Sequence, residues 1–126
     1  MKSKTKHIKI FDDIITLYKA YLPCYQHFPK GFRYTTGKAV YEELTSCIKI
    51  ISQINYLMKE GTAELRSLFV KGMTSMQVIE SYIILAWELK YLSHSKVSEL
   101  KDKLTQVQKQ FYGWYRWYKE KVLTYD

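Results

Sequence analysis

Apolar residues recur at steps of three and four along four stretches of the chain, and this spacing constrains the fold more than any other feature. Such spacing places the apolar residues on one face of an α-helix. The predicted helices cover residues 7–27, 37–59, 63–93 and 96–123. Because short connections join long helices, neighbours are expected to be antiparallel, which predicts an all-α, up-down-up-down four-helix bundle. At 126 residues, the chain is expected to form a single domain, 1–126.

Each predicted helix has a set of residues expected to face inward. For the first helix they are Phe11, Ile14, Ile15, Tyr18, Leu22 and Tyr25. For the second they are Val40, Leu44, Cys47, Ile48, Ile51, Ile54 and Met58. For the third they are Leu65, Leu68, Phe69, Met73, Met76, Ile79, Ile83, Ala86 and Trp87. For the fourth they are Val97, Leu100, Leu104, Val107, Phe111, Trp114, Tyr118 and Val122.

Prolines and threonines mark the first connection. Pro29 disfavours the α conformation in the residue before it, so the first helix is predicted to end by Phe28. Thr35 and Thr36 are predicted to cap the second helix through their side-chain oxygens. Pro23 predicts a kink or an early end within the first helix.

Other residues mark the remaining helix ends. Gly61 is predicted to end the second helix, with Thr62 capping the third. Ser95 or Ser98 is predicted to cap the fourth helix. Gly72 lowers helix propensity and predicts a bend in the third helix.

The net charge of +8 is unevenly distributed. Residues 1–38 carry eight cations and two acids, residues 39–95 carry five and six, and residues 96–126 carry seven and four. Exposed lysines often serve only solubility. Their clustering in the first and last segments instead favours a polyanion partner, bound with an affinity that falls as salt rises.

The predicted bundle brings the first and fourth helices together, so their cations are expected to form a connected basic surface. The lysines at 2–9 would approach Arg116, Lys119 and Lys121 at one end of the bundle, while Lys30, Arg33, Lys38 and Lys96 gather at the other. The predicted nucleic-acid-binding residues are Lys30, Arg33, Lys38, Arg116 and Lys119.

Two apolar features predict contacts beyond a single chain. Residues 81–92 are apolar over more than one stripe, which favours a subunit interface because no helix is central in a four-helix bundle. Residues 111–118 hold six aromatic side chains. Tyr112, Tyr115 and Trp117 are predicted to form an oligomer interface; the alternatives are an ordinary exposed surface or a platform that stacks bases.

The sequence offers little support for catalysis, and no enzyme activity, cofactor or metal is expected. No Glu is followed three residues later by His, as a di-iron bundle requires. Cys24 and His27 lack a second pair of zinc ligands, and no Gly-rich phosphate loop is present. Arg33, Arg66 and Arg116 are not followed by the His that RNA-cleaving helical domains use.

Three further sequence features predict a cytoplasmic protein. Cys24 and Cys47 lie in apolar stripes and are predicted to be buried, reduced thiols. The longest apolar run, 82–87, is much shorter than the ~20 residues of a membrane span. Asp12 and Asp13 interrupt the segment that would form the apolar part of a secretory signal.

Several short motifs resemble a known family. Pro29-Lys30, Arg33-Tyr34 and Gly37, before the stripe that begins at Val40, resemble a signature of four-helix-bundle proteins. The signature is shared by the 23S rRNA intervening-sequence type and the accessory variability determinants of diversity-generating retroelements. Residues 107–114, ending in Gly113-Trp114, are similar to the Gly-Trp helix of the accessory determinants. Thr36 stands where the family more usually has Leu.

The accessory determinants are favoured because a segment typical of the intervening-sequence branch is missing near residues 55–61. The resemblance implies a basic homopentamer that binds a reverse transcriptase together with template RNA or cDNA. The alternative is a scaffold of the intervening-sequence type that binds protein partners or rRNA. A small-molecule or metal-binding protein is disfavoured by the absence of ligand spacing.

Overall fold

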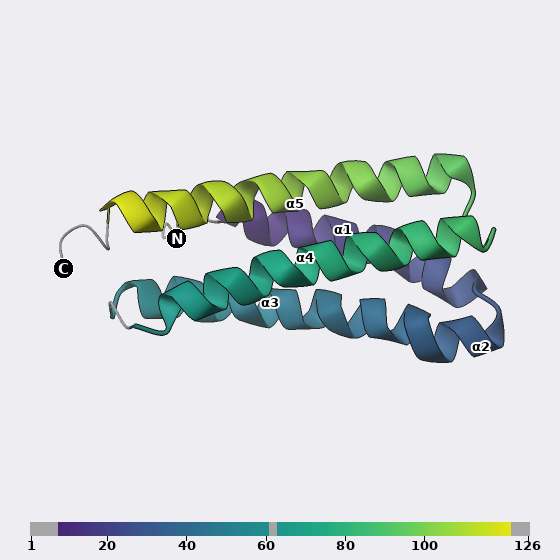
Figure 1. Cartoon of the computed structure of the whole chain (residues 1–126), viewed down its shortest axis with the longest axis horizontal. Coiled ribbons are helices and arrows are strands. Elements are labelled where there is room, and N and C mark those ends of the chain that lie inside the picture. Colours follow the sequence, from purple (N-terminus) through teal and green to yellow (C-terminus); the bar gives the residue numbers. More distant parts are fainter. Residues whose placement is uncertain (1–7, 61–62, 122–126) are drawn as a thin grey trace.

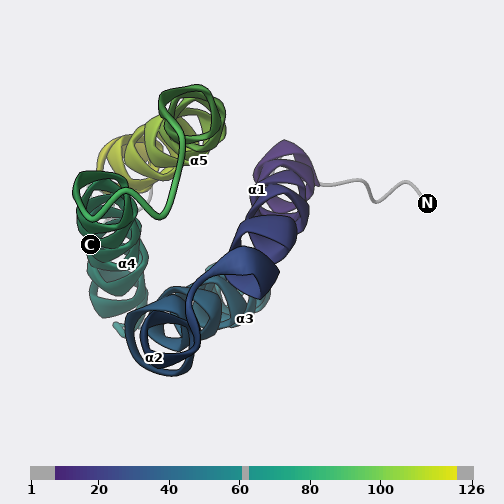
Figure 2. The same cartoon turned by 90° about the vertical axis from the view of Figure 1, so that its right-hand side faces the viewer.

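The computed structural model describes residues 8–60 and 63–121. Its long helices are α1 (Ile8–His27), α3 (Lys38–Met58), α4 (Leu65–Glu88) and α5 (His94–Lys121). Each packs against two others, through the pairs α1–α3, α3–α4, α4–α5 and α5–α1 (Figure 1). Figure 2 shows the helices in this order around the bundle. The predicted antiparallel four-helix bundle is confirmed, and the described residues contain no strand.

Buried residues in the long helices alternate between steps of three and four. In α5 they are Val97, Leu100, Leu104, Val107, Phe111, Trp114 and Tyr118, as predicted for the described part of this helix. The corresponding residues of α4 are Leu65, Phe69, Gly72, Met76, Ile79, Ile83 and Ala86. The average step of 3.5 keeps one narrow face of each helix toward its neighbours and favours nearly parallel packing.

The predicted inward face of α1 is confirmed in part, because Ile14 is buried and Ile15, Tyr18 and Tyr25 are partly buried against the core. The buried residues are Ile10, Ile14, Leu17, Tyr21, Cys24 and Phe28, whereas Phe11 is 39% exposed. The predicted Tyr18 and Tyr25 instead lie along the contact with α3, where their ring centroids are 5.5 Å and 5.7 Å from that of Tyr41. The buried Tyr21 hydroxyl donates to the carbonyl oxygen of Gly37 at 2.8 Å. The apolar arc of α1 therefore covers both the core and one helix–helix contact.

The first connection differs in part from the prediction. α1 ends at His27, as expected from Pro29, but continues through Pro23 without an early end. A short helix, α2 (Lys30–Phe32), and a π-helical segment, η1 (Arg33–Gly37), then lead directly into α3. Helical structure therefore begins at Lys30 rather than at residue 37. The predicted threonine cap is wrong, because α3 has no side-chain cap and Thr35 Oγ1 donates to the carbonyl oxygen of Gly31 at 2.8 Å.

The connection between α4 and α5 is longer than predicted. α4 ends at Glu88 rather than near residue 93, because the Tyr91 and Lys90 N–H groups donate to the carbonyl oxygens of Ala86 and Trp87. This pattern closes a helix with a left-handed residue, here Lys90 with φ 68°. The predicted Ser95 or Ser98 cap is wrong, because the Ser93 hydroxyl accepts a bond from the Lys96 N–H at 3.1 Å. Gly61, Thr62 and Val122 lie outside the described residues.

Gly72, where the sequence predicts a bend, lies inside the uninterrupted α4 and provides a close contact with α5. A Cβ atom placed on Gly72 would lie 2.5 Å from the Phe111 ring, and Phe111 is fully buried. A Cβ atom on Gly113 would meet nothing within 4 Å. The two glycines therefore have opposite roles, although both lie inside helices.

None of the helices within the described ranges is long and apolar enough to cross a lipid bilayer.

A matched pair of substitutions tests the glycine contact. Both Gly72→Ala and Gly113→Ala gain about 1 kcal/mol of helix propensity. At Gly72 the added methyl overpacks the core, which typically destabilises by about 1–3 kcal/mol. We therefore expect urea unfolding to give a lower stability for Gly72→Ala and a higher one for Gly113→Ala. Equal effects of the two substitutions would contradict the close contact.

A polar cluster lies between α3 and α4 beside the buried thiol of Cys47. The Ser75 hydroxyl donates to Glu43 Oε1 at 2.6 Å. Burial raises the pKa of Cys47 to about 12, and burial also raises that of Tyr21 above its usual range. Cys24 and Cys47 are both free and buried, as predicted. The fold therefore holds both thiols in the protonated form.

This burial predicts that the protein loses stability in alkaline solution. Above pH 9 the unfolded chain releases the Cys47 proton, whereas the folded chain keeps it up to about pH 12. Unfolding is favoured across this window, by up to about 1.4 kcal/mol per pH unit for each such group. Urea unfolding at several pH values should give a flatter alkaline dependence for Cys47→Ala than for the native chain. An unchanged slope would show that Cys47 does not contribute.

Candidate functional site

The positive charge of the long helices lies on α5. This helix carries seven cations and three acids, whereas α1, α3 and α4 each carry two cations and two acids. A polyanion approaching the described part of the bundle would therefore be attracted mainly to α5.

An exposed row of residues, called here the α5 strip, follows the outer face of this helix. It consists of Lys109, Tyr112, Arg116 and Lys119, all exposed and spaced by three, four and three residues. This spacing puts them on one line along the helix, over about 15 Å. The Arg116 guanidinium lies 5.2 Å from the centre of the Tyr112 ring, and Lys119 Nζ lies 4.8 Å from that of Tyr115. The strip thus places one aromatic ring among three cations.

The structure does not bring the five predicted cations into one surface. Lys30, Arg33 and Lys38 lie where α2 and η1 enter α3, at one end of the bundle (Figure 1). Arg116 and Lys119 lie near the end of α5, at the other. Lys96, at the first end, is about 30 Å along α5 from Arg116, because a helix rises ~1.5 Å per residue. The five predicted cations thus form two groups at opposite ends of the bundle, as expected from the antiparallel arrangement.

The group at the α2 end is partly engaged by the protein itself. Arg33 Nη1 donates to the carbonyl oxygen of Gln26 at 3.1 Å. Lys38 Nζ is 3.9 Å from Glu42 Oε2. Lys96 Nζ is 2.9 Å from Glu99 Oε1, and this bond raises the pKa of Lys96. Because of these contacts, Lys30 is the predicted cation at this end that is most available to bind an external anion.

At the other end, Lys9 Nζ lies 3.0 Å from Asp13 Oδ2. Lys2, Lys4 and Lys6 lie outside the described residues. Lys9 is therefore engaged by a carboxylate of its own helix, whereas Arg116 and Lys119 are exposed on α5.

The three aromatic residues predicted at an interface differ in exposure. Tyr112 is 60% exposed. Tyr115 and Trp117 are partly buried against the core, and the Tyr115 ring centroid lies 5.3 Å from that of Phe69. Tyr112 is therefore the most accessible of the three.

Four exposed apolar side chains lie at the C-terminal end of α4 and in the turn that follows it. This α4-end group consists of Leu85, Trp87, Leu89 and Tyr91, each between 39% and 45% exposed. It falls within residues 81–92, where the sequence has more apolar residues than one helix face requires.

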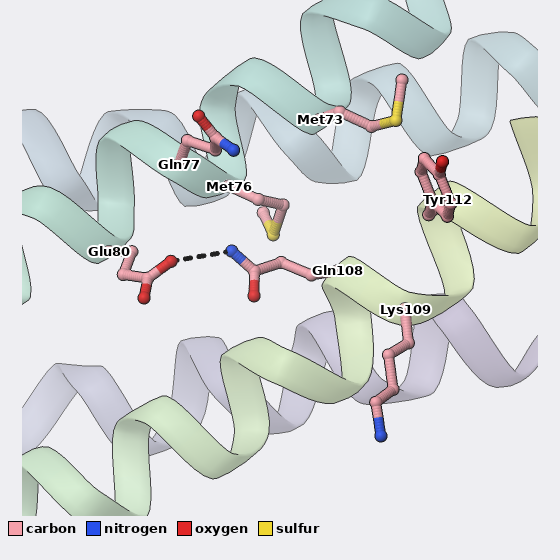
Figure 3. A pocket seen from close by; sticks show the side chains of 7 residues that line it. All are labelled: Met73, Met76, Gln77, Glu80, Gln108, Lys109 and Tyr112. Atoms are coloured by element: carbon pink, nitrogen blue, oxygen red, sulfur yellow. Dashed lines mark hydrogen bonds between the residues drawn. The ribbon is translucent and has the colours of Figure 1, made fainter.

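A pocket of about 430 Å³ lies between α4 and α5, beside the α5 strip. Its lining consists of Met73, Met76, Gln77, Glu80, Gln108, Lys109 and Tyr112 (Figure 3). Gln108 Nε2 donates to Glu80 Oε1 at 3.1 Å, and Lys101 Nζ lies 3.7 Å from Glu80 Oε2. Lys109 and Tyr112 belong to both the pocket and the strip.

Sequence reasoning missed this pocket and Lys109. The available signal was the spacing of Lys109, which lies three residues before Tyr112 and seven before Arg116. Glu80 and Gln108 gave no such signal, because they lie on different helices and meet only when α4 packs on α5.

The site is suited to binding anions and planar rings. Among residues 8–60 and 63–121, no group of three His, Cys, Asp or Glu side chains could hold a metal ion. The strip offers cations beside an exposed aromatic ring, and the pocket adds an apolar surface with a carboxylate and an amide.

This chain matches no protein-family model, no curated protein and no solved structure.

Proposed function

We propose that this protein is a non-enzymatic accessory protein that binds single-stranded nucleic acid, RNA or cDNA, along the α5 strip. The observation that carries the proposal is one row of exposed residues on the outer face of the most basic helix, in which an aromatic ring lies among three cations: Lys109, Tyr112, Arg116 and Lys119. Proteins that bind single strands commonly combine a cationic track with aromatic rings on which bases stack.

The strip supplies both kinds of contact. Lys109, Arg116 and Lys119 neutralise phosphates, which releases counterions and makes the affinity depend on salt. Tyr112 is exposed enough to stack a base, and Arg116 already lies over its ring. Phosphate contacts hold a strand in place without reading its sequence. The α2-end cations Lys30, Arg33 and Lys38 would contact only a strand long enough to reach the opposite end.

The resemblance to accessory variability determinants adds the proposed partners. On that basis, the protein forms a homo-oligomer, a pentamer in the family, and holds nucleic acid beside a reverse transcriptase. The α4-end group supports contacts with protein, because it holds four exposed apolar side chains within residues 85–91. The same group favours the second candidate, a scaffold of the intervening-sequence type that binds protein partners.

Charge reversal on the strip separates these candidates. In Lys109→Glu/Arg116→Glu/Lys119→Glu, we expect binding of a fluorescent single-stranded RNA to fall by at least tenfold at low salt. The slope of log affinity against log salt should fall by about 2, since each phosphate contact contributes about 0.7. Fluorescence anisotropy at several salt concentrations measures both quantities.

The matched control is Lys49→Glu/Lys59→Glu/Lys71→Glu. It changes the net charge equally, at exposed positions of α3, its C-terminal end and α4. Circular dichroism should show the same helicity in both variants. Equal weakening in both would mean that net charge, rather than the strip, governs binding. Absence of salt-dependent binding by the native chain would favour the protein-only scaffold.

A further inference from the structure

The pocket between α4 and α5 has an apolar end and a polar end. Met73 and Tyr112 lie at one end, and Gln77, Glu80 and Gln108 lie toward the other, with Met76 between them (Figure 3). Met76 is fully buried. A volume of about 430 Å³ lies within the range of small-molecule sites. This arrangement suits a planar ring with a hydrogen-bonding edge.

The polar end retains hydrogen-bonding capacity. Glu80 Oε1 accepts a bond from Gln108 Nε2 and Oε2 lies 3.7 Å from Lys101 Nζ, but a carboxylate has about four acceptor positions. The Gln108 amide has a second N–H and a carbonyl oxygen. The polar end can therefore accept two adjacent donors and donate to one acceptor.

Among the common nucleobases, guanine matches this pattern. Its Watson–Crick edge has adjacent N1–H and N2–H donors beside the O6 acceptor. The corresponding edges of adenine, cytosine and uracil each have one donor group, next to an acceptor that would face the carboxylate. We propose that the pocket binds one guanine base of the nucleic acid held on the α5 strip, an inference that rests on the proposed function.

The pocket is continuous with the strip. Tyr112 lines both, so it can contact a base while its neighbours hold the backbone. The Lys109 side chain extends away from the pocket centre in Figure 3. From there it can contact a phosphate outside the pocket. Met73 supplies a polarisable thioether that packs favourably against rings. The strip then gives general affinity, and Glu80 with Gln108 gives a base preference.

The test uses oligouridines that differ at one central base. For the native chain, a central guanosine should bind roughly tenfold more tightly than adenosine or uridine, because a bidentate contact to a base edge discriminates against the other bases. Inosine, which lacks the N2 amine, should lose most of this gain. Glu80→Gln should abolish the guanosine preference while leaving plain oligouridine bound at least as well, since it removes a negative charge.

Glu88→Gln is the matched control, because it makes the same charge change on an exposed part of α4 and should keep the preference. Salt-dependent binding of every oligouridine without a guanosine preference would overturn the pocket inference and leave the proposed function standing. A preference that survives Glu80→Gln, or that inosine reproduces in full, would also overturn it. Failure of every oligonucleotide to bind at low salt would overturn the proposed function and the pocket inference with it.

Discussion

The close approach of α4 and α5 at Gly72 sets the register of the functional surface. The Phe111 ring occupies the space where any other residue at position 72 would have a Cβ atom. On one side of this contact, Phe69 packs edge-on against Trp114, with ring centroids 5.2 Å apart. On the other side, Glu80 meets Gln108. A shift of one helical turn, about 5.4 Å, would separate both pairs. The pocket therefore depends on a packing contact that is not part of the pocket.

Polar contacts at the edges of the core align the other helix pairs. Gln110 bonds Asp13 between α5 and α1, and Ser75 bonds Glu43 between α4 and α3. These partly buried pairs join different helices, whereas the exposed ion pair Lys38–Glu42 lies within α3 and is worth little in water. An apolar core built at every third or fourth residue can slide by a turn, whereas each polar pair can form in only one alignment.

The sequence predicts the fold class and most of the core, because α3, α5 and the first part of α4 each have one narrow apolar stripe. Near the end of α4 the apolar residues exceed one stripe, and Trp87, predicted to face inward, is 41% exposed. The prediction for α1 is only partly right, because tyrosines and isoleucines there cover a wider arc and two neighbouring stripes fit a helical repeat equally well. Only the packed structure shows that Tyr21, rather than Tyr18 or Tyr25, enters the core, where its hydroxyl bonds the Gly37 carbonyl. The end of α4 is missed for a local reason: Lys90 takes a left-handed conformation for which the sequence offers no glycine.

The candidate site is only partly predictable, because some of its residues lie on one helix and others meet only when two helices pack. Arg116, Lys119 and Tyr112 follow from their composition and spacing on one helix. Glu80 and Gln108 are separated by 27 intervening residues, and their contact depends on the Gly72–Phe111 packing. The placement of cations at both ends of the bundle follows from the antiparallel order of the helices. The exposed strip on α5 depends on which side chains lie on its outer face, and net charge alone does not give that.

Acidic residues on α5 explain why its basic strip is short. Asp102 lies seven residues before Lys109 on the same outer face, and Glu99 pairs with Lys96 one turn earlier. A strand that follows α5 past Lys109 toward the α2 end thus meets negative charge. One chain then offers three cations along about 15 Å. Repeating this strip on several linked copies would raise the overall affinity through effective concentration, without any new contact. If the protein assembles as proposed, several copies of this short strip would therefore hold a polymer more tightly than one copy can.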